Sequence, residues 1–197
     1  MAATRGQQIG IWTIAIVMLV GTLGSFAVMI LQNDNSASDT ATKQADYEKQ
    51  LAEYTKQQKE AAQTNAANSE ALPGYSAATF DAASVTALKK EILVAGTGEE
   101  VKSTDSIKAS YFGWLSDGTI FDSSKKKDAD DAPATFPLSG VIKGWTEGLA
   151  GQRVGSVVKL TIPGDLGYGA TGSGIIPANA PLEFIVQIHS IEAATKE

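Results

Sequence analysis

An uncharged segment near the N-terminus, Ile9–Leu31, constrains this chain more than any other feature. About 20 apolar residues are enough to cross the hydrocarbon core of a bilayer as a helix, so we expect a transmembrane helix over residues 9–31. A secretory signal peptide is the alternative, although its apolar region is usually only about 7–15 residues long. Small residues near 36–38 leave cleavage open as an outcome.

The charges around this segment predict its orientation. Arg5 and the N-terminal amino group precede it, whereas Asp34 and Asp39 follow it. Positive charge is enriched on the cytoplasmic side of membrane spans. We therefore expect residues 1–8 in the cytoplasm and the rest of the chain outside, in a single-pass protein of the cell membrane.

A polar region, residues 32–84, is expected to link this segment to a folded domain. Its part from 43 to 65 is rich in helix-forming residues and lacks Gly and Pro, which predicts a helix. Tyr47, Leu51 and Tyr54 follow a heptad spacing, but only about two heptads are present, and a coiled coil usually needs three or four. We expect a solvated helical spacer, with dimerisation through this helix as the alternative.

From Val85 onwards the chain changes to short strands separated by turns. Alternating apolar residues from Ile107 predict a half-buried strand, and Asp117-Gly118 predicts a hairpin. A short helix is expected from Trp145 to Ala150, and a last strand over 182–191. Several antiparallel strands with one short helix indicate the α+β class.

The composition excludes several kinds of chemistry. The 197 residues include no cysteine, which rules out disulfides, a thiol nucleophile and Cys-ligated metals. The one histidine argues against a multi-His metal site or a Ser-His triad. A net charge of −6 argues against nucleic-acid binding. We expect no metal or other cofactor, and we expect His189 to be exposed and inert.

The stretch Thr135–Trp145, TFPLSGVIKGW, concentrates apolar groups around two glycines. A tryptophan at the start of a short helix, directly after Val141 and Ile142, is suited to form the floor of a pocket. The alternative is an ordinary buried core tryptophan, since aromatic side chains are more often buried than exposed in sites.

Residues 85–193 resemble an FKBP-type peptidyl-prolyl cis-trans isomerase domain. The resemblance rests on three ordered blocks: YFGWLSDGTIFDSS from Tyr111, FPLSGVIKGWTEGLAG from Phe136, and LGYGATGSGIIPANAPLEF from Leu166. It implies a twisted antiparallel sheet curled around one short helix, with an aromatic cleft between them.

The resemblance also implies the residues of the site. It gives catalytic roles to Tyr111, Asp122 and Tyr168, and it lines the substrate cleft with Phe121, Phe136, Val141, Ile142, Trp145, Ile176 and Phe184. Phe136 and Phe184 have the alternative of being plain core, and Asp122 that of capping a turn. Ala134 departs from the second aromatic of many relatives and resembles the bacterial macrophage-infectivity-potentiator branch. The Gly-rich loop also resembles a shortened version of the one in small cytosolic relatives.

The activity expected from this resemblance is cis-trans isomerisation of X-Pro bonds in unfolded or exported polypeptides, without a cofactor. Trp145 would hold the proline ring, and the Ile142 N–H and the Tyr168 hydroxyl would bind substrate carbonyls. Asp122 would orient polar groups such as Tyr111 and would not act as a base. A macrolide inhibitor is a further expected ligand. The alternatives are a membrane-tethered chaperone or Pro-segment binding module without essential catalysis, and a dimeric scaffold.

Overall fold

A computed structural model of the protein describes residues 37–192. The predicted membrane segment, residues 9–31, therefore lies outside the described residues. Within residues 37–192, no helix combines the length and the apolar character that a membrane span requires. The chain divides into two compact units at Lys59, inside the helix α2, Ala37–Asn68. This helix contains the whole of the predicted segment 43–65 and is longer at both ends.

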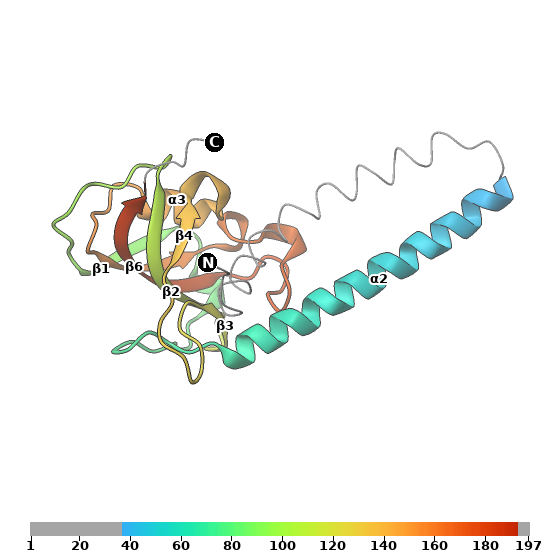
Figure 1. The fold of residues 1–197 in the computed structure, drawn as a ribbon, viewed down its shortest axis with the longest axis horizontal. Helices are drawn as coiled ribbons and strands as arrows, with labels where there is room; N and C mark the ends of the chain where they lie inside the picture. The colour runs from blue at the N-terminus through green and yellow to red at the C-terminus, as the bar shows by residue number, and fades with distance from the viewer. Residues whose placement is uncertain (1–36, 193–197) are drawn as a thin grey trace, which may run out of the picture. The chain divides into compact units, whose positions relative to one another are not determined.

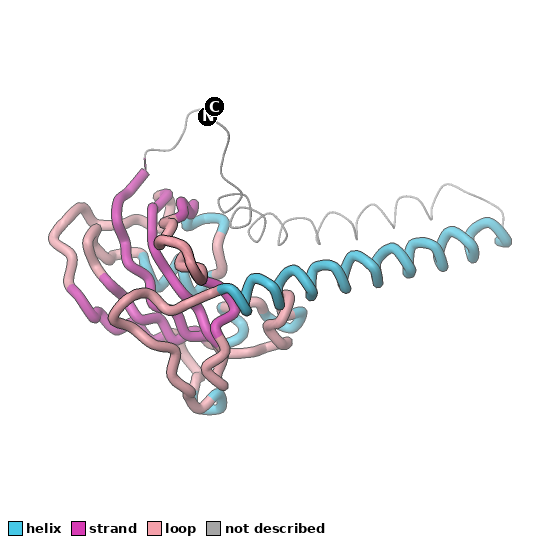
Figure 2. Tube along the Cα trace, turned by 60° about the horizontal axis from the view of Figure 1, so that its bottom comes forward, coloured by secondary structure: helices cyan, strands magenta, loops and turns pink. Residues whose placement is uncertain are grey.

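A six-stranded antiparallel sheet forms the second unit (Figures 1 and 2). The order of its main path is β1-β5-β6-β2-β3, and β4 pairs with the first part of the β2 edge whose last part pairs with β3. The strands are β1 Lys89–Val94, β2 Ser106–Trp114, β3 Ile120–Ser123, β4 Ala134–Pro137, β5 Val157–Ile162 and β6 Leu182–Glu192. The predicted α+β class with an antiparallel sheet and a short helix is confirmed.

The short helix α3, Lys143–Leu149, packs against β5. Two glycines on its inner side allow the helix to approach the strand closely. A Cβ added to Gly144 would lie 2.4 Å from Ile162, and one added to Gly148 would lie 2.7 Å from Leu160. This close packing places Trp145, in the first turn of α3, over the sheet.

The opposite face of the sheet is also covered, which corrects the expectation of a half-buried strand over β2. Phe112 and Trp114 alternate with the cleft-facing residues of this strand, yet both are fully buried. They form a second cluster with Leu72, Val157 and Ile185, and residues of the 71–80 segment pack against it. Trp114 Nε1 also donates a hydrogen bond of 2.9 Å to the Ala78 carbonyl. The strand is buried on both faces because residues 71–80, part of the region that was expected to be only a polar linker, cover its second face.

Candidate functional site

Five aromatic rings from four strands and one helix form a continuous cluster on the α3 side of the sheet. Trp145 is its centre, with ring centroids 5.4 Å from Tyr111, 5.2 Å from Phe136 and 5.4 Å from Phe184. Tyr111 lies 5.3 Å from Phe136, and Phe121 lies 5.4 Å from Phe184. All these contacts are edge-to-face, the arrangement that the charge distribution of aromatic rings favours. The rings that the sequence placed in one cleft are therefore brought together.

Gly113 provides the space for this cluster on β2. A Cβ at this position would lie 2.4 Å from Phe184 Cε1 and 2.6 Å from Phe121 Cζ. Real Cβ atoms do not approach other atoms so closely, so a side chain at Gly113 would displace one of the two rings. The packing of Phe184 and Phe121 against β2 therefore requires a glycine at position 113.

The Tyr111 hydroxyl donates a hydrogen bond of 2.5 Å to Asp122 Oδ2. Burial raises the pKa of Tyr111 well above its ordinary value, and the adjacent Asp122 carboxylate raises this pKa further. Asp122 accepts this hydrogen bond from a hydroxyl that stays protonated, so the carboxylate fixes the direction of the O–H bond. The pair lies on neighbouring strands, with Asp122 opposite Gly113 in the β2–β3 register.

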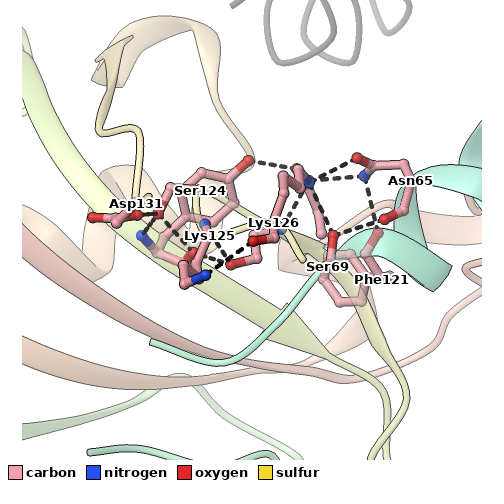
Figure 3. Close-up of polar contacts among 10 residues, drawn as sticks. Asn65, Ser69, Phe121, Ser124, Lys125, Lys126 and Asp131 are labelled. Carbon is pink, nitrogen blue, oxygen red and sulfur yellow. Dashed lines mark hydrogen bonds and ion pairs between the residues drawn. The ribbon is translucent and has the colours of Figure 1, made fainter. Parts of the chain in front are cut away.

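The second carboxylate oxygen, Asp122 Oδ1, is also fully engaged. It accepts hydrogen bonds from the Ser123 N–H at 2.8 Å, from Asn65 Nδ2 at 2.8 Å and from Lys126 Nζ at 3.2 Å. The first of these bonds joins neighbouring residues within β3, so it is not the turn cap that the sequence offered as an alternative. Sequence reasoning missed Asn65 and Lys126, and Figure 3 shows both near Phe121. No periodicity or motif marked them.

Tyr168 comes from the Gly-rich loop, which contains two short 3-10 turns, η3 Gly164–Leu166 and η4 Gly169–Thr171. Burial and, secondarily, the Asp122 carboxylate raise the pKa of Tyr168 to about 12. Its hydroxyl is therefore protonated at neutral pH and is able to donate a hydrogen bond. Ile176, from the end of the same loop, is buried.

Val141 and Ile142 are partly exposed where the chain enters α3. The Ile142 carbonyl accepts hydrogen bonds from the Trp145 and Thr146 N–H groups at 2.9 and 3.3 Å. Among residues 37–192, the Ile142 N–H donates no hydrogen bond to a backbone carbonyl. This donor lies at the start of α3, three residues before Trp145.

Two further groups bear on the predictions. Trp145 Nε1 is buried and, among residues 37–192, has no hydrogen-bond partner.

His189 is exposed and lies outside the aromatic cluster. It is not isolated, because its Nε2 is 2.7 Å from the hydroxyl of Ser110. That hydroxyl also donates to Asp131, so the serine lies between the two other groups. This order differs from a catalytic triad, in which the histidine lies between serine and acid.

Comparisons with known proteins agree with this geometry. The model of the FKBP-type peptidyl-prolyl cis-trans isomerase family matches residues 97–189. The FKBP-type isomerase FkpA of Aeromonas hydrophila is 49% identical over 105 residues, covering 53% of this chain and 38% of that protein. FkpA of Escherichia coli K12 is 37% identical over 141 residues, covering 72% of this chain and 51% of that protein.

A smaller relative, the FK506-binding protein of Neisseria meningitidis serogroup A, is 43% identical over 99 residues. The match covers 50% of this chain and 90% of that protein. This chain therefore belongs to the FKBP-type peptidyl-prolyl cis-trans isomerase family, as the three sequence blocks predicted. It spans 38% and 51% of the two FkpA proteins.

Proposed function

We propose that this protein catalyses the cis-trans isomerisation of X-Pro bonds in polypeptide chains. The observation that carries the proposal is the edge-to-face cluster of Trp145 and four other aromatic rings. Two neutral donors accompany it: the N–H of Ile142, the residue before α3, and the hydroxyl of Tyr168, whose pKa burial and the Asp122 carboxylate raise. The arrangement suits an apolar ring flanked by peptide carbonyls, which describes a proline within a chain.

Isomerisation needs no acid-base group because no bond to carbon is made or broken. The barrier of about 18–20 kcal/mol comes from resonance between the carbonyl and the nitrogen. The planar amide is more polar than the twisted amide, so water stabilises the planar form more. An apolar cleft removes this preference, and each 1.36 kcal/mol gained for the twisted state is about tenfold in rate.

The proposed roles follow from position. Trp145, Phe136 and Phe184 hold the pyrrolidine ring and exclude water, and Phe121 supports Phe184. Ile142 and Tyr168 donate hydrogen bonds to the flanking carbonyls, with Val141 and Ile176 as apolar walls. Tyr111 closes the cleft and is held by Asp122, which acts as an orienting acceptor.

Turnover of a short X-Pro peptide by the full chain tests this proposal. We expect faster cis-to-trans relaxation than in buffer, and inhibition by a macrolide that occupies the cleft. A Trp145→Ala variant is the matched negative control, with its fold checked by circular dichroism. Peptide binding without acceleration would instead support the alternative of a chaperone or Pro-segment binding module.

We also propose that residues 9–31 anchor the protein in the cell membrane, with residues 1–8 cytoplasmic and the isomerase domain outside. The lack of charge in this segment and the position of Arg5 support the proposal. Its substrates would then be unfolded or newly exported chains near the membrane. Protease added to intact cells should digest the domain, and carbonate extraction should leave the full chain in the membrane. Release of the chain by carbonate would indicate a cleaved signal peptide.

A further inference from the structure

The last two turns of α2 lie against the cleft wall, although they precede the family-matched residues 97–189. Asn65 Nδ2 donates to Asp122 Oδ1 at 2.8 Å and to the Phe121 carbonyl at 3.3 Å. One side-chain amide therefore contacts both the orienting carboxylate and the backbone beside it. Both contacts join residues more than 50 positions apart and are partly buried.

Lys126 completes the same network from the loop after β3. Its Nζ donates to Asn65 Oδ1 at 2.7 Å, to Ser69 Oγ at 2.9 Å and to Asp122 Oδ1 at 3.2 Å. Ser69 Oγ in turn donates to the Asn65 carbonyl at 2.8 Å. Figure 3 shows Asn65 and Ser69 facing Lys126. The amide of Asn65 is thereby oriented, since its oxygen faces the ammonium group and its nitrogen faces the carboxylate.

The helix end also contacts the Gly-rich loop. A Cβ added to Gly174 would lie 2.5 Å from the Cβ of Ala62. Ala62 precedes Asn65 by three residues, so both lie on one face of α2. Gly174 belongs to the loop that carries Tyr168 and Ile176. The same helical face therefore touches the two segments that supply the polar groups of the site.

The carboxylate has one oxygen for each side of the network. Oδ2 accepts from the Tyr111 hydroxyl, and Oδ1 accepts from the Ser123 N–H, from Asn65 and from Lys126. Without the two side-chain donors, only the neutral backbone bond from Ser123 would remain at Oδ1. The carboxylate would then have more freedom about its side-chain torsions and would direct the Tyr111 O–H bond less well. Lys126 is a charged donor, and charged donors make the strongest bonds of this kind.

We propose that Asn65 and Lys126 are positioning residues of the isomerase site, which act through Asp122 to hold the Tyr111 hydroxyl. The end of α2 is thus part of the site rather than only a spacer. The expected effect on kcat/KM rests on the proposed function. The expected effect on the Tyr111 hydroxyl does not depend on it.

The test compares Asn65→Ala and Lys126→Met in the full chain with matched controls on the same elements. Gln63→Ala and Lys127→Met replace exposed side chains. We expect roughly a tenfold loss of kcat/KM in each test variant, as for removal of one member of a coupled hydrogen-bond network, and no change in the controls. A ring NMR resonance of Tyr111 should shift in the test variants only.

A double-mutant cycle separates positioning from a general effect on the fold. In an Asp122→Ala background, Asn65→Ala should change neither the Tyr111 resonance nor the Kd for an X-Pro peptide, read from Trp145 fluorescence. Full additivity of the two substitutions, or an unmoved Tyr111 resonance in Asn65→Ala, would overturn the inference. If the unsubstituted chain fails to accelerate isomerisation, the proposed function fails. The Tyr111 resonance and the peptide Kd then still decide the role of Asn65.

Discussion

At the scale of single residues, the candidate site contains two tyrosine hydroxyl groups that stay neutral. Tyr111 and Tyr168 are both held in the protonated form by burial and by the Asp122 carboxylate, which raise their pKa values. Desolvation disfavours the phenolate, and a nearby negative charge disfavours it again. These two tyrosines are therefore hydrogen-bond donors over the whole physiological range.

A Tyr111→Phe substitution should destabilise the protein and slow turnover. It leaves Asp122 Oδ2 without its donor, and hydrogen bonds to charged groups are worth about 1.5–3 kcal/mol. We expect a loss of that size in the free energy of unfolding, measured with urea, together with a lower kcat/KM. Tyr75→Phe is the control, because Tyr75 packs against the second cluster on the opposite face of the sheet. An unchanged unfolding curve for Tyr111→Phe would show that the short hydrogen bond contributes nothing.

A plot of kcat/KM against pH should be flat, whereas many enzymes show a bell-shaped profile. No ionising group acts as an acid or base in the proposed mechanism, so kcat/KM should be constant between about pH 6 and 9. An ionisation within this range that abolishes turnover would contradict the orienting role of Asp122.

Stability, in contrast, should fall at high pH. A tyrosine whose pKa is raised on folding stabilises the folded state fully below its unfolded pKa and loses this contribution as the pH rises through the folded pKa. For Tyr168 the window begins at the ordinary value of 10.0 and ends at about 12. Urea unfolding at increasing pH should show a smaller decline in Tyr168→Phe than in the unsubstituted protein. If the free energy of unfolding falls equally in both proteins, groups other than Tyr168 cause the loss of stability at high pH.

At the scale of elements, β2 organises the site because it pairs with β3, β4 and β6. Its residues alternate between the aromatic cleft and the second cluster, so one strand connects both cores. The strand is long enough to pair with β4 at its beginning and with β3 at its end. The cleft wall is therefore sensitive to any change of volume along β2.

Gly113→Ala should destabilise the protein by about 1–3 kcal/mol, the usual cost of overpacking a core. The new methyl group would collide with Phe184 and Phe121, so peptide affinity should fall as well. Gly140→Ala is the control, because its Cβ would meet only Pro137 Cγ at an ordinary 3.5 Å. The measurements are urea unfolding and the Kd for an X-Pro peptide. A neutral Gly113→Ala would mean that the two rings move apart without cost.

At the scale of the whole molecule, the fold includes a segment that the family-matched residues 97–189 do not contain. Residues between Asn68 and Lys89 cover the second cluster, with Leu72 buried and Phe80 packed against it. The FKBP-type unit therefore begins inside α2, consistent with a compact unit from Glu60. The match to Escherichia coli FkpA covers 72% of this chain, more than residues 85–193 alone.

A chain that begins at residue 60 should fold, whereas one that begins at residue 85 should be severely destabilised. Truncation at 85 exposes Trp114 and removes Leu72, and the loss of one buried leucine side chain alone costs about 2–5 kcal/mol. Thermal unfolding and near-ultraviolet circular dichroism of the two purified chains compare them directly. Equal melting temperatures would show that the 60–84 segment is dispensable for the fold.

The sequence by itself determined the fold class, because strand alternation and the Asp117-Gly118 turn are local signals that can be read from spacing. The aromatic residues of the cluster were implied by the resemblance of the three ordered blocks to a known family. Tertiary structure alone decided that β2 is buried on both faces and that Asn65 and Lys126 hold Asp122. These contacts join segments that are far apart in the chain. The local sequence around a polar residue such as Asn65 is the same whether its side chain faces water or a carboxylate, so no local pattern predicts the contact.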